Sequence, residues 1–250
     1  MSARFKVVIP ARYGATRFPG KPLSTIGDKT LIEHVHDAAS ASSAKQVIIG
    51  TDDARIEAAC REFGAQVVMT SPDHQSGTDR VAEVMTRINE PDDAIVVNVQ
   101  GDEYGLPSAL IDQVANALAL NRDKVMATLC ERIADAADLR NPNVVKVVFD
   151  SSGTALYFSR APVPWRAENA GNAAAPAFRH IGIYAFRVGF LKRFTTMRVC
   201  ELERSERLEQ LRALYNGYRI HVEEACVPSG IGVDTPEDLE RARRHRRGLN

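Results

Sequence analysis

The sequence lacks the motifs that identify most common enzyme classes. No G-x-G-x-x-G run is present, which argues against a dinucleotide redox cofactor, and neither a G-x-S-x-G elbow nor an H-E-x-x-H helix occurs. The four cysteines are widely separated and form no C-x-x-C pair (Cys60, Cys130, Cys200 and Cys226). This spacing favours reduced thiols over a disulfide framework or a zinc site.

Net charge and long apolar runs are also missing. The 32 Lys and Arg residues balance the 32 Asp and Glu residues, so no overall field attracts nucleic acid or an anionic membrane. No uninterrupted apolar run approaches the roughly 20 residues that span a bilayer, and no signal-peptide pattern is visible. We therefore expect a soluble, cytoplasmic protein with neither a nucleic-acid nor a membrane partner, in which phosphate recognition is local.

What the sequence does contain is a regular alternation of strand-like and helix-like segments. Apolar strand-like runs at 5–9, 47–49, 66–69 and 94–99 alternate with helix-like stretches at 53–63, 78–88 and 108–120, with Ser108 as an N-cap. This alternation predicts an α/β fold built from βαβ units, with a mixed, mainly parallel sheet and helices on both faces.

The second half of the chain changes character. Residues 144–150 and 155–159 flank a Ser-Ser-Gly turn and predict a β-hairpin, an antiparallel excursion from the parallel sheet. Further strands are expected at 181–187 and 220–225, helices at 206–215 and 236–246, and a mobile loop at 167–177. No linker separates two cores, so we expect a single domain over 1–250, with halves at about 1–130 and 131–250.

The loop after the first strand is rich in cations and glycine. Arg12, Arg17 and Lys21 stand with Gly14 and Gly20 within a dozen residues of the strand end. Open α/β sheets bind ligands at the carboxyl ends of strands, and glycines let the backbone approach phosphate oxygens. The spacing fails the Walker pattern at two points. The loop predicts an anion-binding site, with a solvated surface loop as the alternative.

Two aspartates are candidates for holding a metal ion. Asp102 follows Gly101 at the end of the buried strand 94–99, and Asp234 stands just before the helix 236–246. Each alone has a simpler explanation, a turn residue for Asp102 and a helix N-cap for Asp234. Two acids together with a cationic phosphate loop indicate Mg²⁺ that bridges phosphate oxygens.

Other polar segments are ambiguous by themselves. Residues 73–80 have hydroxyl, amide and backbone groups that suit a nucleotide base, but on its own the segment is better explained as a helix-capping turn. His180 opens an apolar strand, where a structural role is the usual one. Glu209 and Gln210 lie in a charged helix, where a solvated face is the default.

Read together, these segments resemble the 3-deoxy-manno-octulosonate (Kdo) cytidylyltransferase family over nearly the whole chain. The resemblance rests on the ordered blocks 9–13, 17–23, 73–80, 97–103, 141–146, 157–161, 180–184, 208–212 and 232–239. The sequence departs from the family at Tyr104-Gly105, where Pro and an aliphatic residue are usual, and in the Ala-rich stretch after Trp165.

The resemblance implies a reaction and a set of site residues. The reaction is transfer of CMP from CTP to the anomeric hydroxyl of Kdo with release of diphosphate, for lipopolysaccharide synthesis, by a homodimer that uses Mg²⁺. The implied CTP-binding residues are Pro10, Ala11, Arg12, Lys21, Gln75, Ser76, Gly77, Arg80 and Gln100. The implied catalytic residues are Arg12, Lys21, Asp102 and Asp234, the last two as metal ligands. The implied sugar-binding residues are Arg160, His180, Tyr184, Glu209 and Gln210.

Two alternatives stay open. A cytidylyltransferase for another 2-keto sugar acid, such as 8-amino-Kdo or a sialic acid, would share the CTP half and differ around the sugar-binding residues. A nucleotide- or sugar-binding protein without turnover is the alternative from a different class. The pair Asp102 and Asp234 argues against that second alternative, because binding alone does not need two metal-binding acids.

Overall fold

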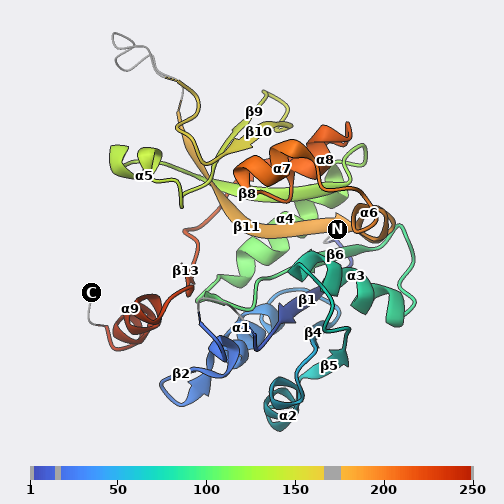
Figure 1. Ribbon diagram of the computed structural model, residues 1–250, viewed down its shortest axis with the longest axis vertical. Coiled ribbons are helices and arrows are strands. Elements are labelled where there is room, and N and C mark those ends of the chain that lie inside the picture. The colour runs from blue at the N-terminus through green and yellow to red at the C-terminus, as the bar shows by residue number, and fades with distance from the viewer. Residues whose placement is uncertain (1–2, 15–17, 166–175, 249–250) are drawn as a thin grey trace.

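A computed structural model describes residues 3–14, 18–165 and 176–248 and shows a central sheet between two helical layers (Figure 1). The nine strands of this sheet are β1 (Phe5–Ala11), β4 (Val47–Thr51), β5 (Gln66–Met69), β6 (Ile95–Asn98), β8 (Met126–Arg132), β9 (Lys146–Phe149), β10 (Ala155–Ser159), β11 (Phe178–Arg187) and β12 (Ile220–Glu224). Four shorter strands form two separate ribbons: β2 (Thr25–Ile26) with β3 (Lys29–Thr30), and β7 (Glu103–Tyr104) with β13 (Ile231–Gly232).

The sheet is mixed, and β10 and β11 run antiparallel to all its other strands. Its main path is β10-β9-β11-β6-β1-β4-β5, and β8 joins β12 to β11. The long strand β11 pairs with β9 at its start, with β6 at its end and with β8 along its other edge. The prediction of a mixed, mainly parallel sheet with an antiparallel hairpin is confirmed.

Neighbouring residues of the central strands point to opposite sides of the sheet. Both faces therefore carry apolar side chains, and helices cover both. Val7 and Ile9 of β1 pack into one apolar core, and Val8 packs into the other. The first core receives α1 (Leu31–Ser40), α2 (Ala54–Glu62), α4 (Ser108–Leu120) and α9 (Pro236–Arg246). The second receives α3 (Gly77–Arg87), α6 (Val188–Phe194) and α8 (Leu211–Tyr215).

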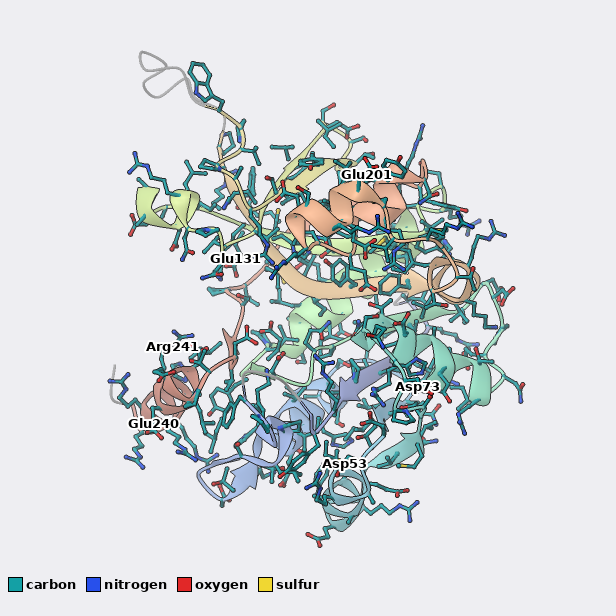
Figure 2. All side chains as sticks on the ribbon, viewed as in Figure 1. Asp53, Asp73, Glu131, Glu201, Glu240 and Arg241 are labelled. Atoms are coloured by element: carbon teal, nitrogen blue, oxygen red, sulfur yellow. The ribbon has the colours of Figure 1, made fainter. Side chains whose placement is uncertain are left out.

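Charged side chains lie on the outer surface of the helices, away from the sheet (Figure 2). Glu201, Glu240 and Arg241 are exposed and project away from the two cores (Figure 2). All residues of β6 are buried, as expected for a central strand that helices cover on both faces.

Two of the predicted local features are wrong. The N-cap of α4 is Pro107, and Ser108 is the first helical residue, because Pro107 adopts the extended conformation that starts the helix. The predicted helix 206–215 is two helices, α7 (Glu201–Glu206) and α8, separated at Arg207, which has a left-handed backbone with φ of 54°. The charge pattern of 206–215 is helical, but it contains no signal for this break.

Several elements were not predicted, namely α1, α5 (Ala136–Arg140), α6, β8 and the short turn η1 (Lys21–Leu23). Most of the predicted loop 167–177 lies outside the described residues, as does Arg17. No disulfide joins the cysteines, three of which are buried while Cys226 is exposed. Within the described ranges, no helix has both the length and the apolar character needed to cross a membrane.

Candidate functional site

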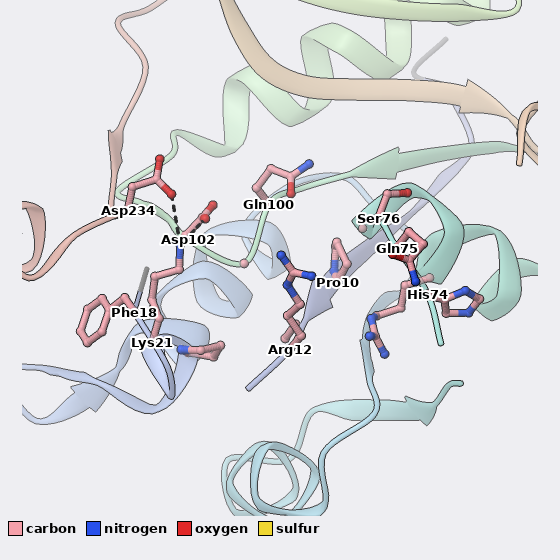
Figure 3. A pocket seen from close by; sticks show the side chains of 15 residues that line it. Pro10, Arg12, Phe18, Lys21, His74, Gln75, Ser76, Gln100, Asp102 and Asp234 are labelled. Atoms are coloured by element: carbon pink, nitrogen blue, oxygen red, sulfur yellow. Dashed lines mark hydrogen bonds and ion pairs between the residues drawn. The ribbon is translucent and has the colours of Figure 1, made fainter. Parts of the chain in front are cut away.

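A cavity of about 340 Å³ opens where β1 and β6 end (Figure 3). It contains all the predicted nucleotide-binding residues and both predicted metal ligands, together with four residues that were not predicted as site residues. Its lining consists of Pro10, Ala11, Arg12, Phe18, Lys21, Pro22, His74, Gln75, Ser76, Gly77, Arg80, Gln100, Gly101, Asp102 and Asp234. The strand ends of an open α/β sheet thus meet in one site, as expected.

Two glycines allow the cavity walls to come together. A side chain at Gly101 would place its Cβ 2.9 Å from the backbone oxygen of Pro10, closer than real Cβ contacts allow. A Cβ at Gly77 would lie 3.2 Å from the Pro10 ring. Gly77 opens α3, and Ser76 caps this helix by accepting from the Asp79 N–H in a reciprocal capping box. The first turn of α3 therefore faces the cavity with a fixed geometry.

The arginines of the cavity differ in how their charge is balanced. Arg80 is 3% exposed, and its guanidinium donates to Asp52 Oδ2 at 3.0 Å and to the hydroxyl of Thr70. Arg12 is exposed and has no ion pair in the part of the chain that the structure describes. Arg12 is thus the guanidinium available to an anionic ligand, whereas Arg80 holds the wall between β4 and α3 in place.

Lys21 brings the two predicted metal ligands together. Its Nζ lies 2.6 Å from Asp102 Oδ2 and 3.4 Å from Asp234 Oδ1, although these aspartates are 132 positions apart in the numbering (234 minus 102) (Figure 3). The backbone explains why the two aspartates come close together. β7 pairs antiparallel with β13, and the Val233 N–H donates to the backbone oxygen of Asp102 at 2.9 Å. The N-cap of α9 is Thr235, so capping does not account for Asp234.

Glu103 is a third acid at this place, which the sequence analysis did not single out. The pKa of Glu103 is raised to about 7, mainly by burial and also by the negative charges of Asp102 and Asp234. Its position directly after Asp102 in the chain was the only signal. The two carboxylates that line the cavity, Asp102 and Asp234, make this edge favourable for cations.

The chemistry of this edge fits Mg²⁺. Carboxylate oxygens are the ligands that this hard cation prefers, and Asp102 and Asp234 already converge on one ammonium group. The described residues contain no group of three or more His, Cys, Asp or Glu side chains arranged to hold a metal by themselves. This agrees with the usual Mg²⁺ site in which one or two carboxylates are completed by ligand phosphates and water.

The departure at Tyr104-Gly105 lies in the ribbon that joins the two acids. Tyr104 is buried in the core, with its ring 5.1 Å from the ring of His34 in an edge-on contact. Gly105 has a positive φ of 70°, which suits glycine. Neither residue lines the cavity.

The predicted sugar-binding residues lie outside this cavity. Glu209 lines a neighbouring cavity that shares Gln75 and Ser76 with the first. The Thr78 hydroxyl donates to Glu209 Oε2 at 2.6 Å, and burial raises the pKa of Glu209. Gln75 and Ser76 therefore connect the first cavity to the one that Glu209 lines.

His180 and Tyr184 form an aromatic pair on β11, with ring centres 5.2 Å apart. His180 Nε2 lies 2.9 Å from Thr128 Oγ1, which also approaches the backbone oxygens of Ile181 and Ile183. Because the single hydroxyl proton of Thr128 serves a backbone oxygen, we assign the Nε2–H tautomer to His180, with Nε2 donating to Thr128. Burial lowers the pKa of His180 to about 3 and raises that of Tyr184. His180 is therefore neutral.

The remaining two predicted residues differ in their surroundings. Arg160 donates to the backbone oxygens of Glu206 at 2.7 Å and Pro142 at 2.8 Å, so its guanidinium joins three segments. Gln210 is 5% exposed, and its buried Nε2 has no hydrogen-bond partner in the described ranges. A buried donor of this kind is costly unless a ligand or water satisfies it.

Comparisons with known proteins agree with this geometry. A family model described as cytidylyltransferase matches residues 6–220. The 3-deoxy-manno-octulosonate cytidylyltransferase of Pseudomonas syringae pv. tomato is 57% identical, with 98% of each chain covered. The protein of that name from Marinobacter nauticus is 55% identical, with 96% of this chain and 95% of that one covered.

Among solved structures, one is similar in sequence as well as in fold, and another is similar in fold alone. CMP:2-keto-3-deoxy-manno-octonic acid synthetase, solved in complex with CTP, is 39% identical with a TM-score of 0.92, covering 99% of this chain and 100% of that chain. A 4-diphosphocytidyl-2C-methyl-D-erythritol synthase shares the fold at 16% identity and a TM-score of 0.63, covering 97% of this chain and 98% of that one. The sequence identity, the coverage and the cavity agree: the chain belongs to the 3-deoxy-manno-octulosonate cytidylyltransferase family.

Proposed function

We propose that this protein transfers CMP from CTP to the anomeric hydroxyl of Kdo and releases diphosphate. The observation that carries this proposal is the single cavity in which the cationic loop, the first turn of α3 and the acids Asp102 and Asp234 meet. Relatives at 54–57% identity bear the name of this activity, and the structural relative binds CTP.

The cavity divides into parts that suit the parts of a nucleoside triphosphate. The first turn of α3, with Gln75, Ser76 and Gly77, and the amide of Gln100 supply hydrogen-bonding groups for the base and ribose. Arg12 and Lys21 supply positive charge for the triphosphate, with Arg12 as a bidentate donor. Pro10, Ala11 and the buried Arg80 form the wall that holds these groups apart.

The barrier of the reaction comes from bringing two anions together in line. Arg12 and Lys21 would offset charge on the α-phosphate and on the leaving diphosphate. Positioning of the sugar hydroxyl against the α-phosphorus contributes up to about 7–11 kcal/mol for well-oriented reactants. Asp102 and Asp234 would hold Mg²⁺, which when bound supplies electrophilic charge for phosphate oxygens. No residue of the chain needs to act as a nucleophile.

We assign the sugar-acid pocket to the region next to the shared wall of Gln75 and Ser76. Glu209 and the buried Nε2 of Gln210 are suited to sugar hydroxyls, and neutral His180 is suited to a hydrogen bond rather than to charge neutralisation. The carboxylate of the sugar acid would then be met by Arg160 and by Tyr184, whose raised pKa keeps its phenol as a donor.

We also propose that the protein is a cytoplasmic homodimer that serves lipopolysaccharide synthesis. The hairpin of β9 and β10 lies at one edge of the sheet and exposes Leu156 at 61%, and Trp165 beyond it is 81% exposed. Contiguous exposed apolar surface marks interaction sites, and we place the dimer contact at this edge of the sheet. Light scattering at micromolar concentration is expected to give twice the chain mass, and the Leu156→Glu variant is expected to give a monomer.

The activity is tested by diphosphate release from CTP and Mg²⁺ with a panel of sugar acids. Release is expected with Kdo, and EDTA is expected to stop it. Asp102→Asn and Asp234→Asn should each lower kcat about 100-fold or more with the circular dichroism spectrum unchanged. Release with a sialic acid or 8-amino-Kdo but not with Kdo would move the assignment to that substrate, and no release with any of them would refute the proposal.

A further inference from the structure

Lys21 is held where it contacts both acids of the cavity. Its side chain is 11% exposed, and its Nζ donates to Asp102 Oδ2 at 2.6 Å and approaches Asp234 Oδ1 at 3.4 Å. The backbone is equally fixed, because Lys21 opens the turn η1 and its carbonyl accepts from the Ser24 N–H at 3.0 Å. The ammonium therefore has a defined position between the two carboxylates.

A divalent cation would need the same carboxylate oxygens. Mg²⁺ and Mn²⁺ bind oxygen lone pairs at short range, and the lone pairs that face the Lys21 ammonium are already used in charge-assisted hydrogen bonds. A unit positive charge a few ångströms away also repels the incoming cation. Lys21 and the metal ion thus compete for Asp102 and Asp234.

We propose that Lys21 acts as a competitor of the metal ion, and that the triphosphate of the nucleotide removes this competition by drawing the ammonium to itself. This inference rests on the proposed magnesium site. Lys21 lines the nucleotide cavity beside Arg12, so its flexible four-carbon stem reaches a bound phosphate without movement of the backbone. Metal binding to the acids then follows nucleotide binding or accompanies it.

The geometry explains why Lys21 fits this role and Arg80 does not. Arg80 lies in the same cavity, but Asp52 and Thr70 hold its guanidinium in the wall. Asp102 keeps 31% of its side-chain surface exposed, so its oxygens can be reached by a cation from solution once the ammonium turns away.

The test measures Mn²⁺ binding by electron paramagnetic resonance, without nucleotide or sugar. Lys21→Met keeps about the same side-chain length but removes the ammonium. It is expected to bind Mn²⁺ about tenfold more tightly than the unmodified protein. This factor corresponds to an ion-pair energy between those of exposed and buried pairs. Lys21→Arg keeps the charge and should show no gain. Lys45→Met removes the same charge from an exposed loop position and should also show none.

Two further measurements locate and extend the effect. The gain should vanish in the double variant Lys21→Met/Asp102→Asn, because Asp102 supplies one of the contested oxygens. CTP should strengthen Mn²⁺ binding by a factor about tenfold smaller in Lys21→Met than in the unmodified protein. A titration of CTP without protein corrects for Mn²⁺ that CTP binds by itself. Circular dichroism verifies that each variant is folded.

The outcomes separate this inference from the proposed function. Equal Mn²⁺ affinity in Lys21→Met and the unmodified protein, or a gain that persists with Asp102→Asn, would overturn the inference even if diphosphate release from CTP and Kdo is intact. If Lys21→Met binds Mn²⁺ more tightly but the unmodified protein releases no diphosphate with any sugar acid, the proposed function is overturned and the competition stands.

Discussion

The burial of His180 predicts a specific dependence of stability on pH. The ring lies between Phe158 and Tyr184, with ring centres 5.1 and 5.2 Å away, and burial lowers its pKa to about 3. In the unfolded chain a histidine titrates near pH 6.5. Below that pH the unfolded state gains a proton that the folded state does not bind, so the contribution of His180 to stability is lost as the pH falls from about 6.5 towards 3.

The magnitude follows from the two pKa values. Between pH 7.5 and pH 5.0, proton binding to the unfolded state lowers the free energy of unfolding by up to about 2 kcal/mol. The variant His180→Gln keeps an amide donor for Thr128 but cannot take up a proton. We therefore expect urea unfolding of the variant to lose up to about 2 kcal/mol less than the unmodified protein over this interval.

The test compares the change in the free energy of unfolding between the two pH values in the variant with the same change in the unmodified protein. Other titrating groups are present in both proteins, so their contributions cancel. His36, whose pKa is lowered by burial, is one such group. If the two proteins lost the same free energy of unfolding between pH 7.5 and 5.0, the lowered pKa assigned to His180 would be wrong. A larger loss in the variant would contradict the sign of the effect.

Two further predictions concern the cavity wall and the region beside it. Gly101→Ala would push a methyl group against the Pro10 backbone oxygen at 2.9 Å, so we expect a loss of about 1–3 kcal/mol in urea unfolding and a raised KM for CTP; an unchanged KM would refute the close approach. Arg212 donates to Glu203 at 2.6 and 2.8 Å in a buried pair. Arg212→Met should lower stability by about 3–5 kcal/mol, and the added change Glu203→Leu should recover much of it; equal stability of the single and double variants would show that the unpaired Glu203 is not the cause.

The sequence predicted the elements whose signals are local. The alternation of apolar and polar segments identified β1, β4, β5 and β6, and Pro236 with its acidic neighbours identified α9, which spans the predicted residues 236–246. The hairpin of β9 and β10 followed from its turn residues. These predictions needed only the period of the pattern and the residues that begin or end it.

Other features depend on tertiary contacts that no local pattern contains. The break at Arg207 places Glu209 beside Thr78 of α3, a contact across 131 positions. The role of Thr128 in holding His180 arises where β8 meets an irregular stretch of β11 between Ile181 and Tyr184. Such features become visible only when the strand order is known.

The residues predicted to bind the nucleotide came mainly from the family resemblance, and the structure brings them into one cavity. Composition and spacing alone reached an anion-binding loop and two candidate acids. They gave no reason for Asp102 and Asp234 to meet, because the ribbon of β7 and β13 consists of two short pairs without a strand signal. The assignment of the sugar-binding residues stays a prediction.

The ribbon that delivers Asp234 is among the last parts of the chain to be made. Every strand of the nine-stranded sheet ends by Glu224, whereas β13, Asp234 and α9 come afterwards. A protease cut near residue 230 would therefore spare every strand of the sheet, but it would remove Asp234 together with the α9 residues that cover the first core. Such a trimmed protein is expected to lose turnover, because Asp234 would be absent even where Arg12, Lys21 and Asp102 remain.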